Sequence, residues 1–188
     1  MTLDKKLYTA FPPSYINMYI KQQLSDFGIL SGYEQMEPIF PVSPTNLDDV
    51  FKNYIGAPGE ENPLLIQYDR MIRFRPNPFY AHKREQLMYT LYCTKMDKIY
   101  DATRIIFESL DREDAAAQDI NKYVQSEYNA GNITTPNVMF HNLRVYQADE
   151  TRDLIELASV RTTYANKIIV EYDYHSKFLG DSAEKIYN

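Results

Sequence analysis

The sequence predicts an α+β fold, an antiparallel sheet of about four strands packed against one long helix, with a further helix at the N-terminus. Three observations predict it. In residues 64–74, apart from Arg70, and again in residues 87–93, apolar side chains recur at every second position, which is the period of a strand with one buried face. Residues 96–110 change to the spacing of an amphipathic helix. The strand period returns in residues 165–174. Hairpins on either side of a helix predict a sheet that carries its helices on one face.

The first element is a helix that follows two prolines. Ser14 is placed to cap its N-terminus. Gly28 is placed to end it in the left-handed conformation, which glycine adopts without strain. The apolar residues between these two positions follow helical spacing and are Ile16, Tyr19, Ile20 and Leu24.

Residues 31–63 are expected to form a proline-rich, irregular arm. The arm holds five of the ten prolines and has no sustained period, apart from a short helical pattern at residues 46–54. Irregular stretches of this length are uncommon in a small domain and are typical of binding elements or of segments ordered in an assembly. A disordered insert is the alternative.

The first hairpin is expected to span residues 64–94, with an irregular tip that contains two prolines. Thr94 and Asp97 form a variant of the capping box, so the long helix is expected to begin at Thr94. The acidic run at residues 111–114 indicates a break or kink. A more polar helix is expected to continue over residues 115–128.

Two strands, at residues 138–146 and 165–174, are expected to close the sheet. The charged stretch between them, residues 149–163, has no settled period and predicts either a short helix or an excursion of the sheet. The tail at residues 176–188 is expected to be weakly structured. The whole chain, residues 1–188, is expected to form a single domain.

Composition limits the classes of function. The chain has 17 Tyr, 9 Phe and no Trp, and tyrosine suits surfaces that a partner buries as well as half-exposed sheet faces. The net charge of -6 argues against a phosphate-binding surface. Cys93, the single cysteine, excludes an intramolecular disulfide and is expected to be a buried, inert thiol. No apolar run is long enough to enter a membrane, so a soluble protein assembled inside the cell is expected.

No catalytic or metal-binding motif is present. The histidines, His82, His141 and His175, are isolated from one another and from cysteine in the sequence. Glycine-rich phosphate loops and the GxSxG motif are missing. We therefore expect no enzyme activity, no cofactor and no metal. A small enzyme that uses acidic residues such as Asp97 or Glu113 is the alternative.

Two segments are the candidates for contacts with other chains. Strand edges and irregular arms are common ways to bind neighbours in a ring. The candidate contact residues are Pro76, Asn77, Pro78, Phe79 and Tyr80 in the hairpin tip, and Pro38, Phe40, Pro41 and Tyr54 in the arm.

The order of these elements resembles the tail terminator and tail-completion proteins in the neck of contractile-tailed bacteriophages. The resemblance is most specific in QLMYTLYCTKMDKIYDATRIIFESL, residues 86–110. A strand of alternating apolar residues that runs without a loop into a long amphipathic helix is the core of that fold. The resemblance covers residues 64–175 and the first helix, and it is one of pattern.

The resemblance implies a structural virion protein. Such proteins form a ring, usually of six copies, which ends polymerisation of the tail tube and sheath and docks to the head-side connector. The implied partners are copies of the chain itself, the tail tube and sheath proteins, and the connector. The chain would assemble in the host cytoplasm and reside in the virion. Genomic DNA would pass through the lumen without specific binding, in agreement with the net charge of -6.

The resemblance leaves other roles open. The protein could be another neck, connector or baseplate component, such as a head-to-tail adaptor. A non-viral interaction domain is a further alternative.

Overall fold

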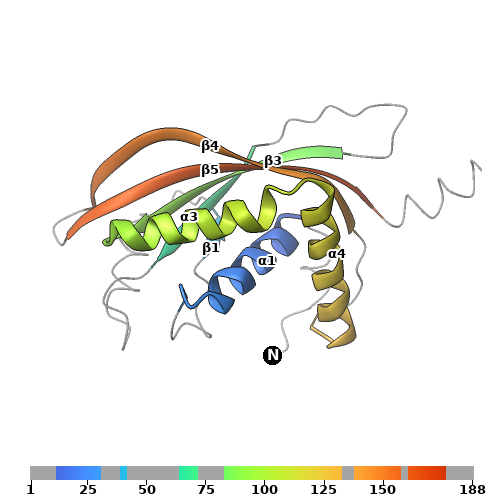
Figure 1. Ribbon diagram of the computed structural model, residues 1–188. Coiled ribbons are helices and arrows are strands. Elements are labelled where there is room, and N and C mark those ends of the chain that lie inside the picture. The colour runs from blue at the N-terminus through green and yellow to red at the C-terminus, as the bar shows by residue number, and fades with distance from the viewer. Residues whose placement is uncertain are drawn as a thin grey trace, which may run out of the picture.

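The computed structural model describes residues 12–30, 39–41, 64–71, 83–132, 138–157 and 161–176. These residues form two layers, a five-stranded sheet and three helices that cover one of its faces (Figure 1). The α+β class predicted from the sequence is confirmed. The strands are β1 (Ile39–Pro41), β2 (Leu65–Met71), β3 (Lys83–Cys93), β4 (Val138–Leu157) and β5 (Arg161–Ser176), and the helices are α1 (Pro12–Asp26), α3 (Met96–Leu110) and α4 (Asp114–Asn129).

The sheet has the strand order β1-β2-β3-β5-β4. The four strands β2, β3, β5 and β4 are antiparallel to their neighbours, as predicted. The fifth strand, β1, pairs in parallel with β2 and lies inside the segment that was expected to be irregular. Three residues are too few to show a period, and Pro41 signals a turn rather than a strand. An edge strand tolerates proline, because the missing N–H group can face away from the sheet.

The core lies between the sheet and the helices. The apolar positions of β3 and β5 that alternate along each strand face the helical layer and are almost completely buried, as the strand period predicted. Full burial of a leucine, isoleucine or valine side chain contributes about 1.5–3 kcal/mol. Cys93 is buried among them, in agreement with the prediction. The members from these two strands are Leu87, Tyr89, Leu91, Cys93, Ile168, Val170, Tyr172 and Tyr174.

Helix α1 begins earlier than predicted and ends where predicted. Pro12 and Pro13 form its first turn, where a missing N–H group costs nothing, so Ser14 lies inside the helix and the prediction of a Ser14 cap is wrong. At the other end Gly28 has φ of 71°. The Ile29 N–H group donates to the carbonyl of Leu24 at 2.9 Å, which closes a Schellman-type end.

The predicted fold class named one long helix, whereas the structure has two helices, α3 and α4, which are separated at the break or kink predicted for residues 111–114. Helix α3 ends at Leu110 and α4 starts at Asp114, and Glu113 between them has φ of 49°, which no helix accommodates. The break falls on the acidic run that indicated it. The cap of α3 is also different from the prediction. The helix begins at Met96 rather than at Thr94, Lys95 occupies the N-cap position without a side-chain cap hydrogen bond, and Asp97 lies in the first turn.

Strand β4 is longer than predicted. It continues through the stretch of unsettled period as far as Leu157, and β5 already begins at Arg161, so the sheet excursion is the correct alternative and the short helix is wrong. The register between β4 and β5 shifts at three places, between His141 and Arg144, between Gln147 and Asp149, and between Asp149 and Asp153. Two of the shifts lie beyond residue 146 and interrupt the period of two there, which explains why the continuation of the predicted strand was not visible in the sequence.

Candidate interaction surface

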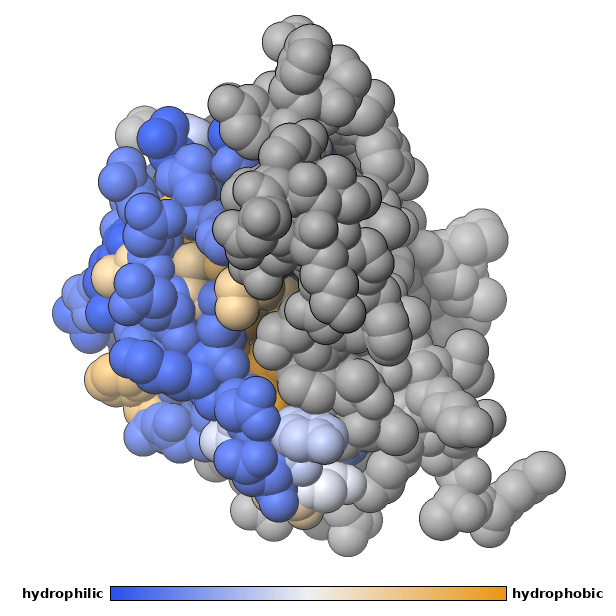
Figure 2. Space-filling model, turned by 90° about the vertical axis from the view of Figure 1, so that its right-hand side faces the viewer, coloured by the Kyte–Doolittle hydropathy of each residue, from blue (hydrophilic) through white to orange (hydrophobic). Residues whose placement is uncertain are grey.

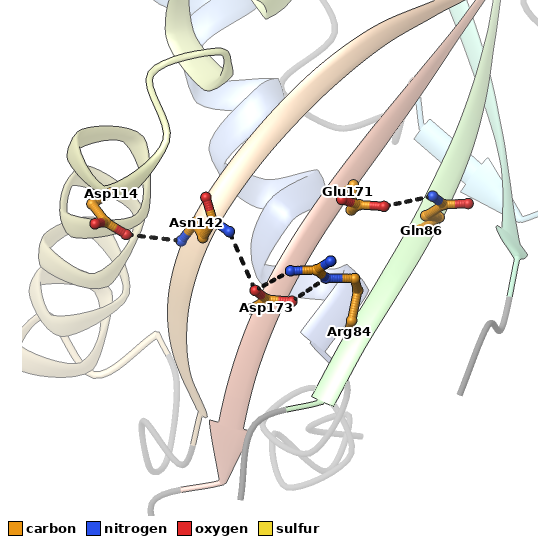
Figure 3. A network of polar contacts seen from close by, with 6 residues as sticks. All are labelled: Arg84, Gln86, Asp114, Asn142, Glu171 and Asp173. Carbon is orange, nitrogen blue, oxygen red and sulfur yellow. Dashed lines mark hydrogen bonds and ion pairs between the residues drawn. The ribbon is translucent and has the colours of Figure 1, made fainter. Parts of the chain in front are cut away.

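The sheet face opposite the helices carries polar side chains that are paired across the strands (Figure 3). The Arg84 guanidinium of β3 donates two hydrogen bonds to the Asp173 carboxylate of β5, at 2.7 and 2.9 Å. The Gln86 amide of β3 donates to Glu171 of β5 at 2.7 Å. These residues are cross-strand partners in the register of β3 and β5. Directly opposite pairs of this kind stabilise a sheet locally.

The ion pair on this face is a surface feature. The hydrogen bond to Asp173 raises the pKa of Arg84, which remains charged at every relevant pH. The Arg84 side chain is 52% exposed, so the pair is worth at most about 1 kcal/mol. Arg84 thus lies on the solvated face of the sheet.

Polar groups of α4 and of the turn before it form hydrogen bonds with backbone groups along the outer edge of β4. We call these residues the edge-capping cluster (Asp111, Glu113, Asp114 and Asn121). The Asn121 side-chain amide forms hydrogen bonds with both backbone groups of one edge residue, Phe140. It donates to the Phe140 carbonyl at 3.0 Å and accepts from the Phe140 N–H group at 2.9 Å.

The acidic members of the cluster accept the next backbone N–H groups along the strand. Asp114 accepts from the N–H group of Asn142 at 3.2 Å, and Asp111 accepts from that of Val145 at 3.2 Å. The Glu113 carbonyl accepts from the Leu143 N–H group at 3.3 Å. An acidic run expected to be a solvated break thus covers a strand edge, which proteins do to prevent unwanted strand pairing.

The surface beside α4 is hydrophilic over most of its described area, with small apolar spots (Figure 2). Large apolar side chains are nevertheless exposed at scattered positions. They are Phe27 at 64%, Tyr100 at 47%, Tyr128 at 43% and Tyr146 at 42% exposure. Other tyrosines lie in the core, among them Tyr15, and Tyr89, which the strand period placed on the buried face. Burial raises the pKa of one of these, Tyr15, to about 12.

A buried carboxylate lies on the helical side of the sheet. Glu85 is 1% exposed and accepts hydrogen bonds from the hydroxyl groups of Tyr172 at 2.8 Å and Tyr174 at 2.7 Å. Burial, followed by the charge of Glu85, raises the pKa of Tyr172 far above its ordinary value. The Tyr172 hydroxyl therefore stays protonated and acts as a donor. Glu85 occupies an inward position of β3, so the strand period predicts an apolar residue there, and the pattern gave no sign of this cluster.

Two of the histidines, separate in the sequence, come together on the sheet face opposite the helices, which we call the open face. His141 Nε2 of β4 and His175 Nδ1 of β5 are 2.7 Å apart. Sequence reasoning missed this pair, because the register of β4 against β5 decides it. In the described part of the chain, no three His, Cys, Asp or Glu side chains are grouped closely enough to hold a metal ion. None of the described helices has the length and apolar character needed to span a membrane.

Two of the predicted contact residues fall on β1. Phe40 is paired with Gln67 and Pro41 with Tyr68 along the sheet. The remaining ones lie outside the described residues, and they are Pro38, Tyr54, Pro76, Asn77, Pro78, Phe79 and Tyr80. The interactions predicted for them stay predictions.

No protein-family model matches this chain, and a search of curated proteins finds no match for it.

Proposed function

We propose that this chain is a structural protein of the tail–neck junction of a contractile-tailed phage. About six copies form a ring that caps the tail tube and sheath, ends their polymerisation and docks to the head-side connector. The protein assembles in the host cytoplasm and resides in the virion. Its partners are copies of itself, the tube and sheath proteins and the connector.

The observation that carries the proposal is the passage from β3 into α3. Strand β3 ends at Cys93 and helix α3 begins at Met96, so two residues separate a central strand from the helix that packs on the same sheet. Helices cover one face, and the other face bears cross-strand pairs (Figures 1 and 3). This is the arrangement on which the resemblance to tail terminators rests.

The two edges of the sheet support a ring. A closed ring needs heterologous contacts, in which one patch of a subunit binds a different patch of the next. The described sheet ends in two unlike strands, the three-residue β1 and the twenty-residue β4. Beyond Tyr164, which pairs with Cys93, strands β4 and β5 continue together without β3 as far as the pair Leu157 and Arg161. Two-stranded ribbons gain most of their stability from packing against something else, which suits a contact between subunits.

The charge balance supports a lumen through which DNA slides. The chain carries 26 acidic and 20 basic residues, so a ring of several copies is strongly negative. A negative lumen repels the phosphate backbone and avoids the sticking that clustered lysine and arginine would cause.

The proposal is tested with the full-length chain and purified tail tubes. Multi-angle light scattering should give a mass of about six copies, either for the free protein or for the protein assembled on tube ends. Electron microscopy of the mixture should show a ring at one end of each tube, and further tube growth should stop. A stable monomer at all concentrations, together with no binding to tubes, would reject the proposal.

A matched pair of variants tests where the subunits touch. Tyr146 is exposed on β4, and Tyr100 is exposed to a similar degree on α3. If the ring forms through the sheet edge, Tyr146→Ala should weaken assembly and Tyr100→Ala should not. The reverse result would place the contact on the helical layer.

A further inference from the structure

The pair of histidines on the open face has the geometry of a ligand pair. His141 Nε2 and His175 Nδ1 are 2.7 Å apart, whereas the ring centroids are 4.9 Å apart and the interplanar angle is 18°. Since the two nitrogen atoms are much closer than the ring centres, the rings meet at their nitrogen-bearing edges. One N–H group must donate to the unprotonated nitrogen of the other ring, so two nitrogen atoms that can each act as a metal ligand already face each other.

We propose that His141 Nε2 and His175 Nδ1 bind a divalent transition-metal cation of the Zn²⁺, Ni²⁺ or Cu²⁺ class. Imidazole nitrogen is a preferred ligand of these ions. Two metal–nitrogen bonds of about 2.0–2.1 Å at a tetrahedral angle hold the nitrogen atoms roughly 3.3 Å apart. The pair therefore has to open by about 0.6 Å, and both side chains are partly exposed. Water completes the coordination shell.

The protons balance without a change of net charge on the rings. In the metal-free pair, one of the two nitrogen atoms at the contact carries a proton. On binding, that proton moves through solvent to the outer nitrogen of the same ring, so both rings stay neutral and both inner nitrogen atoms present lone pairs. No oxidant or reductant takes part.

The backbone around the pair explains why the side chains converge. Strand β4 shifts register between His141 and Arg144, and Asn142 has φ of 49°, a backbone conformation typical of a bulge. The bulge comes directly after His141 and turns the edge strand toward α4. A bound ion links β4 to β5 through the two histidines, on the N-terminal side of the bulge in β4.

Among the residues that the structure describes, no third His, Cys, Asp or Glu side chain is grouped with this pair closely enough to hold a metal ion. Asp173 is the cross-strand partner of His141, but its carboxylate oxygens accept two hydrogen bonds from Arg84 and one, at 3.4 Å, from the Asn142 amide (Figure 3). These bonds hold Asp173 as part of the polar network. The site is therefore a weak, exchangeable two-histidine site rather than a structural metal centre.

Isothermal titration of the full chain with ZnCl₂, NiCl₂ and CuCl₂ tests the proposal, with MgCl₂ as the comparison. We expect one equivalent of at least one of the three ions to bind, and Mg²⁺ to give no signal. The variants His141→Gln and His175→Gln should each weaken binding by at least the roughly 10-fold that loss of a mere supporting group costs at a metal site. In the Cu²⁺ complex, electron paramagnetic resonance should report two coordinated nitrogen atoms.

The third histidine provides a matched control. His82→Gln removes an imidazole from the same chain and should leave affinity and spectrum unchanged. The proposal is overturned if none of the three ions binds, if binding survives in the double variant at positions 141 and 175, or if it is lost in the variant at position 82. Circular dichroism of each variant establishes whether it is folded. If a variant is not folded, the electron paramagnetic resonance spectrum of the wild-type Cu²⁺ complex tests the proposal alone, and a spectrum without two coordinated nitrogen atoms would overturn it.

Discussion

The two hydrogen bonds between the Asn121 side chain and the backbone of Phe140 on β4 lead to a quantitative prediction. The side chain satisfies both backbone groups of Phe140 at once, with distances of 3.0 and 2.9 Å. Asn121→Ala removes both hydrogen bonds. Asn121→Asp keeps the acceptor for the N–H group but loses the donor to the carbonyl, so the two variants separate the two bonds.

The expected magnitude follows from these two bonds. Each is worth about 0.5–1.5 kcal/mol net, so their loss lowers the free energy of unfolding by about 1–3 kcal/mol. Alanine is a better helix former than asparagine by roughly 0.5 kcal/mol, which offsets part of the loss. We therefore expect Asn121→Ala to destabilise the protein by about 0.5–2.5 kcal/mol. Asn121→Asp is expected to lose part of that amount.

Urea unfolding followed by circular dichroism measures the global effect, and hydrogen exchange at the Phe140 amide measures the local one. Gln125→Ala is the control, because Gln125 is exposed on the same helix and its amide donates within α4, to Asn129. It should change stability by no more than a few tenths of a kcal/mol. If Asn121→Ala matches this control and the Phe140 amide exchanges no faster, Asn121 does not hold the strand edge and the reasoning is refuted.

Three further predictions concern single groups. Glu113→Gly should raise the free energy of unfolding by about 0.5–1 kcal/mol, because glycine adopts the φ of 49° at this position without strain. Glu113→Ala should bring no such gain. Equal stability of the two variants in urea unfolding would contradict the idea that Glu113 is strained. Glu85→Ala should destabilise by about 2–4 kcal/mol, because two buried tyrosine hydroxyls lose their acceptor, and Glu85→Gln by less; an unchanged urea midpoint for the alanine variant would disprove this role. Burial raises the pKa of Tyr15 and Tyr123 from the ordinary 10.0 to about 12. The unfolded chain ionises first, so the urea midpoint should hold below pH 10 and fall as the pH rises toward 12; a constant midpoint over that range would count against it.

The regular parts of the fold could be predicted from residues alone. The alternation at Leu87, Tyr89 and Leu91 predicted both the strand and the face it buries, and these three residues are 0% exposed. Gly28 predicted the end of α1 for a local reason, since its left-handed φ is a property of one residue and its neighbours. Such features are short-range consequences of side-chain periodicity and backbone sterics.

The candidate site depended on contacts that no local pattern encodes. Asp111 and Asp114 resembled a solvated break, and only the packing of α4 beside β4 made them acceptors for strand N–H groups. The register between β4 and β5 brought His141 to His175, residues 34 positions apart.

By itself, the sequence determined the α+β class, the inward face of β3 and β5, and the position of the break before α4. The tertiary structure decided which polar groups meet. The physical reason is that burial of an apolar stripe is a property of one segment, whereas a hydrogen bond between two segments depends on their relative register to within an ångström. The register of β4 against β5 shifts at three places, and a pattern of period two does not show which residues face each other after each shift.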